Sequence, residues 1–143
     1  MDELVRSLKA LHTSLIDALQ GYKEGLKDAH GEGLAPLFAE MIAIHGKDAD
    51  AISEQLKRLG TDTDDRGSLM GTFDRTVMKI SSLFTKLDEK FLPSLIDGEK
   101  RVLDHYDRAI NASSPGNAEY PVLVKQREAL RAKVADMGAG KPT

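Results

Sequence analysis

The sequence predicts an all-α fold in which four long helices form an antiparallel bundle. Apolar residues recur at spacings of three and four through most of the 143-residue chain, which is the period of an amphipathic helix. No segment shows the sustained alternation of apolar and polar residues that is typical of a half-buried strand. The periodic segments are separated by stretches rich in glycine, proline or aspartate, as expected for connections between helices.

The first part of the chain predicts two long helices, at about Asp2–Ala29 and Gly33–Leu59. The first apolar stripe consists of Leu4, Leu8, Leu11, Leu15, Leu19, Tyr22 and Leu26. The second consists of Leu34, Phe38, Met41, His45, Ala49, Ile52, Leu56 and Leu59. Because the glycine-rich stretch HGEG is a short connection, the two helices should pack as antiparallel neighbours.

The rest of the chain predicts three further helices. They lie at about Ser68–Leu87, Asp88–Ile110 and Ala118–Met137. The first is the shortest and should lie within the crossing between the second and fourth helices, so the other four form the walls. The loop SSPGN precedes the last helix. Residues 1–137 are expected to form a single domain, and residues 138–143 a flexible tail.

Composition excludes several classes of function. The chain carries a net charge of −3 with acidic and basic residues interspersed, so it lacks the basic stripe of a nucleic-acid-binding protein. It has no cysteine and therefore no disulfide framework or thiolate metal site. No apolar run reaches the roughly 20 residues of a membrane span. The amphipathic start of the chain lacks the apolar centre of a secretory signal, which favours a cytoplasmic protein.

Polar residues on the apolar stripes are the candidate functional residues. Glu99 lies at the centre of the fourth stripe, between Leu95 and Leu103, and His45 lies at the centre of the second. The predicted buried polar cluster consists of Glu99, Arg127, His45, Tyr22 and Tyr106. A buried carboxylate costs several kcal/mol unless it is paired, hydrogen-bonded or protonated. The other four residues are its candidate partners, and the pairing stays open between them.

Glu99 and His45 could instead be the ligands of a metal centre. A di-iron bundle needs a Glu from each of two helices and Glu-x-x-His from each of the other two. The sequence contains no Glu-x-x-His, and Asp17, Glu24 and Glu40 are expected to face away from the stripes. A complete di-iron site is therefore not expected. A mononuclear site for iron or another divalent metal at Glu99 and His45 remains open.

Three stretches carry a resemblance to a known family: GYKEGLKDA (21–29), RLGTDTDDRGSLMGTFDR (58–75) and DGEKRVLDHYDRAI (97–110). Over about residues 2–137 the chain resembles the bacterial ferritin-like family called domain of unknown function 2383, a four-helix-bundle family without an assigned activity. The motifs that match are Tyr22 and Glu24, the Gly67-Ser68 pair, and Gly98-Glu99 followed by Tyr106. The family often has an Arg where this chain has His45, and His-Arg-x-Trp around Phe73. The resemblance implies a ferritin-like bundle, and it does not by itself imply iron.

The sequence thus favours a non-enzymatic helical-bundle protein with a structural or interaction role. The alternatives are a degenerate ferritin-like metal-binding or redox protein, and a sensor in which buried His45 titrates and loosens the bundle. Leu37, Ile44 and Phe91 fall outside the apolar stripes and could support a homodimer or a protein partner.

Overall fold

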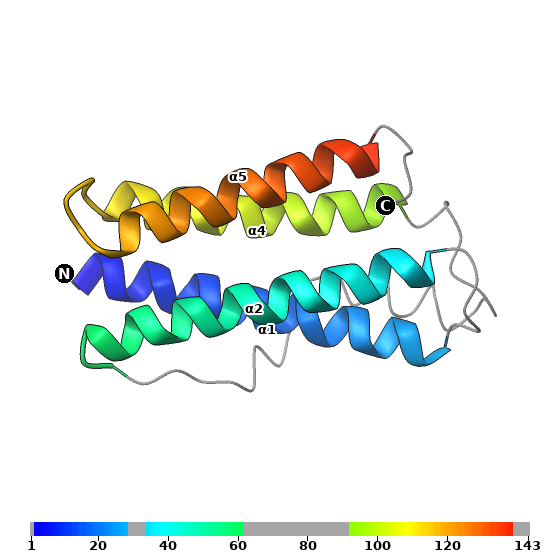
Figure 1. The fold of residues 1–143 in the computed structure, drawn as a ribbon, viewed down its shortest axis with the longest axis horizontal. Coiled ribbons are helices and arrows are strands. Elements are labelled where there is room, and N and C mark those ends of the chain that lie inside the picture. Colours follow the sequence, from blue (N-terminus) through cyan, green and yellow to red (C-terminus); the bar gives the residue numbers. More distant parts are fainter. Residues whose placement is uncertain (1, 29–33, 62–91, 139–143) are drawn as a thin grey trace.

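The computed structural model describes residues 2–28, 34–61 and 92–138. They contain four α-helices, α1 (Asp2–Asp28), α2 (Ala35–Arg58), α4 (Leu92–Ala112) and α5 (Glu119–Gly138), and no strands (Figure 1). The predicted all-α four-helix bundle is confirmed, with the four predicted walls. The short helix predicted at Ser68–Leu87 lies outside the described residues. The last helix ends at Gly138, the last described residue, and residues 139–143 of the predicted tail lie outside the described residues.

The ends of α2 follow from local sequence. Pro36 lies in the first turn, where its missing N–H costs no helical hydrogen bond. At the other end Gly60 has φ = 81°, a left-handed conformation that favours glycine. The Thr61 N–H donates to Leu56 O at 3.1 Å and the Gly60 N–H to Lys57 O at 3.0 Å. This pair of bonds is a Schellman motif, and it satisfies carbonyls at the helix end.

The helix directions give the bundle its topology. In Figure 1, α1 and α5 run in one direction and α2 and α4 in the other, so α2 and α4 are parallel. Around the bundle, α1 packs along both α2 and α4, and α4 packs along α5, each as an antiparallel pair. The fourth pair, α2 and α5, touches at few points. The bundle is therefore closely packed on three sides and loosely packed on the fourth.

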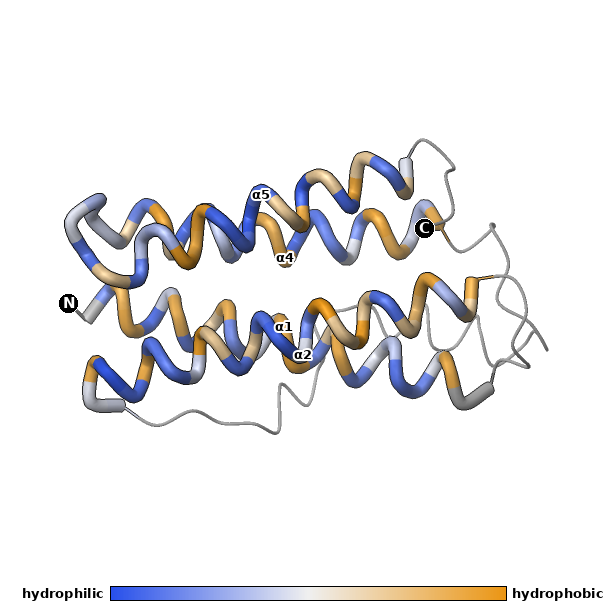
Figure 2. Tube along the Cα trace, in the orientation of Figure 1, coloured by the Kyte–Doolittle hydropathy of each residue, from blue (hydrophilic) through white to orange (hydrophobic). Residues whose placement is uncertain are grey.

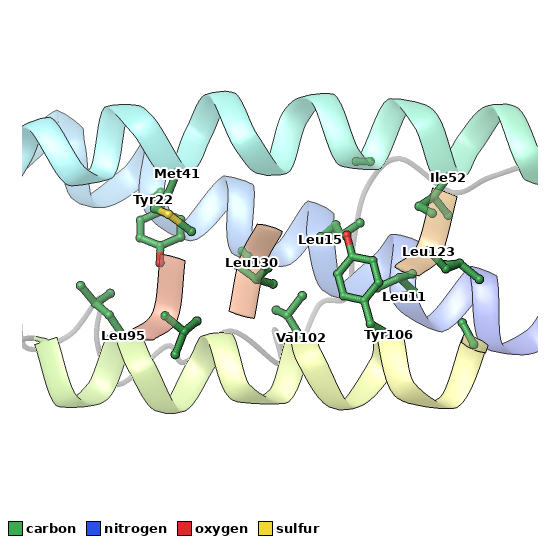
Figure 3. Packing of buried hydrophobic residues seen from close by; sticks show 14 of the residues in the cluster. Leu11, Leu15, Tyr22, Met41, Ile52, Leu95, Val102, Tyr106, Leu123 and Leu130 are labelled. Atoms are coloured by element: carbon green, nitrogen blue, oxygen red, sulfur yellow. The ribbon is translucent and has the colours of Figure 1, made fainter. Parts of the chain in front are cut away.

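The core follows the predicted stripes (Figures 2 and 3). Its largest fully buried side chains are Tyr22, Tyr106, Phe38, Leu8, Leu11, Leu15, Met41, Ile52, Leu56, Leu95, Leu123 and Leu130. Leu37, expected outside the stripes, is buried in this core, and Ile44 is half-buried. Phe91 lies outside the described residues. Leu37 is therefore part of the core, whereas Ile44 keeps part of its surface exposed.

Candidate functional site: a buried tyrosine–glutamate–histidine triad

Three helices bring one polar side chain each to a single point in the core. Tyr22 comes from α1, His45 from α2 and Glu99 from α4, and all three have zero exposed surface. Each occupies the apolar stripe of its helix, so helical periodicity alone directs it inward. Figure 3 shows the Tyr22 ring beside Met41 of α2, with its hydroxyl pointing toward α4.

The Glu99 carboxylate is the centre of this triad. The Tyr22 hydroxyl donates to Glu99 Oε2 at 2.6 Å. His45 Nε2 lies 2.8 Å from Oε2 and 3.0 Å from Oε1. Distances in this range are those of charge-assisted hydrogen bonds, which are stronger than neutral ones. The chain itself therefore satisfies the buried carboxylate from two directions.

The aromatic rings around the carboxylate hold the donors in position. The Tyr22 and His45 rings stack with centroids 5.9 Å apart and an interplanar angle of 25°. Tyr22 also meets Phe38 edge-to-face, with centroids 4.9 Å apart and an angle of 88°. Phe38 and His45 both belong to α2, so two aromatic contacts with α2 position the Tyr22 ring.

Electrostatics in the triad favour a protonated His45. Burial alone lowers the pKa of a histidine because it disfavours the charged form. Here the negative charge of Glu99 and its hydrogen bond outweigh burial, with a further contribution from Asp48, and the pKa of His45 is raised. The pKa of Tyr22 is raised well above its ordinary value by burial and by the Glu99 charge. The Tyr22 hydroxyl therefore stays protonated, and it donates a hydrogen bond to the Glu99 carboxylate.

The second ring nitrogen of His45 takes no part in the contact with Glu99. His45 Nδ1 is buried and has no hydrogen-bond partner among the described residues. A buried ring nitrogen without a partner costs free energy in either protonation state. Asp48, three residues further along the same helix, contributes to the raised pKa of His45, and its own pKa is raised by burial.

Tyr106 lies apart from the triad. Its hydroxyl donates to Gln126 Oε1 on α5 at 2.8 Å. Tyr106 follows Glu99 by two helical turns, about 10 Å along α4. Its pKa is raised by burial and by Asp48, which faces its hydroxyl. Figure 3 shows this hydroxyl pointing toward α2, the helix that carries Asp48.

Arg127 also lies apart from the triad, although it was a candidate partner of Glu99. Its Nε donates to Asp107 Oδ1 at 2.5 Å and its guanidinium also binds Glu128, while its side chain is 28% exposed. The reason is the orientation of α5. The inner face of α5 includes the buried residues Glu119 and Lys133. The centre of this face therefore lies closer to Gln126 than to Arg127. Both positions fit between Leu123 and Leu130, so apolar spacing could not choose between them.

Other polar residues differ from their expected places. Asp17, expected to face outward, is buried with 6% of its surface exposed. Lys133 is buried and binds Glu40 of α2, and the sequence shows no signal for this pair apart from opposite charge.

The triad offers few ligands for a metal. Within the described ranges, no group of three or more His, Cys, Asp or Glu side chains could hold an ion. A closed zinc site takes four protein ligands, and a di-iron site takes more. The third triad member is a phenol whose raised pKa opposes the phenolate form that binds metal. The donor set therefore does not fit a complete metal centre of either kind.

Fold and site together define a helical-bundle protein with a polar triad at the centre of its core. The chain belongs to the family described as domain of unknown function (DUF2383), whose model matches residues 3–112. The match includes all three triad residues and ends with α4, so α5 lies beyond it. No curated protein and no solved structure gives a significant match to the chain. None of the helices in the described ranges is long and apolar enough to cross a membrane.

Proposed function

We propose that the protein has a non-enzymatic structural or interaction role, and that the triad of Tyr22, His45 and Glu99 fixes the alignment of α1, α2 and α4. The observation that carries this proposal is the complete burial of Glu99, with both carboxylate oxygens engaged by the chain's own donors. A buried polar group is stable only in a packing where its hydrogen-bond partners reach it. It can therefore favour one helix register over others.

The proposal includes a ferritin-like bundle in a cytoplasmic bacterial protein. Its support is the parallel course of α2 and α4, because ferritin-like bundles have one long crossover connection between parallel helices. Fractionation of cells that produce the protein tests the location.

The second candidate is a degenerate ferritin-like metal-binding or redox protein. It is favoured by the direct contact between His45 Nε2 and Glu99, and by His45 Nδ1, which has no hydrogen-bond partner within the described ranges. Under this hypothesis His45 and Glu99 would hold the ion and would have to exchange their mutual hydrogen bond for metal coordination. The described part of the chain offers no third carboxylate or imidazole ligand beside them, so the donor set favours the structural role.

Elemental analysis of the wild-type protein and of Glu99→Gln separates the two candidates. The exposed α2 carboxylate Glu54, changed to Gln, is the matched control. The architectural role predicts that Glu99→Gln lowers the free energy of unfolding by about 1.5–3 kcal/mol, as expected for a buried charged hydrogen bond, without changing metal content. About one equivalent of iron, manganese or zinc that is lost only in Glu99→Gln would overturn it.

A further inference from the structure

The loosely packed side of the bundle contains a groove. It lies between α2 and α5 and has a volume of about 420 Å³. This is within the range of small-molecule sites. At about 30 Å³ for a water-sized heavy atom, it has room for roughly 14 such atoms.

The two walls of the groove have the same residue pattern. α2 contributes Ile44, Lys47, Asp48 and Ala51, and α5 contributes Val122, Lys125, Gln126 and Ala129. Each wall is thus a branched aliphatic residue, a lysine, a polar residue and an alanine at the same spacing, which places all four on one helix face.

The antiparallel register explains why space remains between the walls. The contact between Glu40 and Lys133 fixes the register of α2 against α5. In this register Ala129 lies opposite Ile44, and Ala51 lies opposite Val122. Each branched side chain therefore faces a methyl group, which is too short to fill the gap between the helices.

The charges at the rim favour an anion. Lys47 and Lys125 are exposed, and neither forms an ion pair with the described residues, unlike Lys57 and Lys133. Among the described residues that line the groove, Asp48 is the one carboxylate, and it is half-buried. Two lysines against one aspartate leave a net positive site even when Asp48 is ionised.

We propose that the groove between α2 and α5 binds a small amphipathic anion, namely a medium-chain alkyl carboxylate. The carboxylate lies between the ammonium groups of Lys47 and Lys125. The alkyl chain lies against the apolar walls, which are Ile44, Ala51, Val122 and Ala129. Gln126 and Asp48, between these walls, both face the Tyr106 hydroxyl. This site is separate from the triad, and the proposal holds whether or not the triad is architectural.

Decanoate, which has 12 heavy atoms, is a suitable probe. Below its micellar concentration, titration followed by calorimetry and amide chemical shifts should show one saturable site, with shifts confined to residues around 44–51 and 122–129. The double variant Lys47→Gln, Lys125→Gln should bind at least tenfold more weakly. Lys100→Gln, an exposed lysine on α4, is the matched control and should bind as the wild type does. Decanol should bind at least tenfold more weakly than decanoate.

A variant with a filled groove tests the position of the alkyl chain. Ala129→Leu should abolish decanoate binding while its circular dichroism and thermal unfolding remain close to wild type. If that variant does not fold, the lysine variants and the shift map still decide the question, because both lysines are exposed. Equal binding of decanol and decanoate, shifts that map elsewhere, or self-association of the free protein through this face would each overturn the proposal.

Discussion

His45 takes part in the triad through Nε2 and keeps Nδ1 buried without a partner among the described residues. When His45 is protonated, the Nδ1–H group has no acceptor among the described residues, which costs free energy. The positive ring is also attracted by the Glu99 carboxylate, which lowers the free energy. The raised pKa of His45 indicates that this attraction outweighs both burial and the missing partner. Below the raised pKa of His45, the triad is therefore a buried His45–Glu99 ion pair to which Tyr22 adds a hydrogen bond.

The raised pKa of His45 predicts how stability depends on pH. Because the folded state binds this proton more tightly than the unfolded state, the contribution is complete below the ordinary value of about 6.5. It is lost as pH rises through the raised pKa. The free energy of unfolding should fall above about pH 6.5, by up to about 1.4 kcal/mol per pH unit.

Urea unfolding from pH 6 to 9 checks this, with His45→Gln as the comparison. His105 has the opposite sign, because burial and then Arg108 lower its pKa, so its contribution grows as pH rises. Subtracting the variant's profile from the wild-type profile removes that contribution. A difference that does not vary with pH would show that His45 is not the titrating group and would exclude a pH-sensing role for it.

At the residue scale, sequence periodicity was sufficient to place Tyr22, His45 and Glu99 in the core, because each has apolar neighbours three or four positions away. It could not select the partners of Glu99. That choice depends on the height of each residue along its helix and on the rotation of α5, which only packing determines. Arg127 and Tyr106 were equally good candidates by spacing, and both bind elsewhere.

At the element scale, α1 and α2 approach closely at Gly25. A Cβ atom added there would lie 2.5 Å from Cε2 of Phe38, whose ring is buried against Tyr22. Glycine in the middle of a helix costs roughly 1 kcal/mol relative to alanine. The Phe38 ring, which packs against Tyr22, occupies the space that a Cβ atom at position 25 would need. This explains why the sequence has glycine there.

Gly25→Ala and Gly46→Ala form a matched pair that tests this. Gly25→Ala should lower the free energy of unfolding, because overpacking of about 1–3 kcal/mol exceeds the gain in helix propensity. At Gly46 the nearest atom to an added Cβ is Leu19 Cδ1 at 3.9 Å, an ordinary contact. Gly46→Ala should therefore raise stability by up to about 1 kcal/mol. Urea denaturation of both variants measures the difference, and stabilisation by Gly25→Ala would contradict the close approach.

The sequence predicted the positions of the elements well, because their ends carry local signals. Gly60 and the SSPGN loop are examples, and the helices end or begin within two residues of the predicted positions there. The least regular stripe was that of α5, whose inner face includes Glu119 and Lys133. A face built partly from charged residues has no clear apolar period, so its rotation could not be inferred.

At the scale of the whole molecule, the four walls of the bundle and the family followed from helix lengths and motifs. The loose packing between α2 and α5 could not be predicted. It results from alanines that lie opposite aliphatic residues in one particular register, and register is a property of the assembled bundle.

The triad also joins distant parts of the chain, since Tyr22 and Glu99 are 77 residues apart. Closing so long a loop is entropically costly, and a contact of this kind forms after the local pairs α1–α2 and α4–α5 if those hairpins nucleate folding. Losing a contact that is absent from the folding transition state mainly increases the unfolding rate. In stopped-flow experiments, Tyr22→Phe should therefore speed unfolding several-fold and leave refolding almost unchanged. The expected role of the triad in kinetic terms is therefore to form late in folding and to slow the unfolding of the native protein.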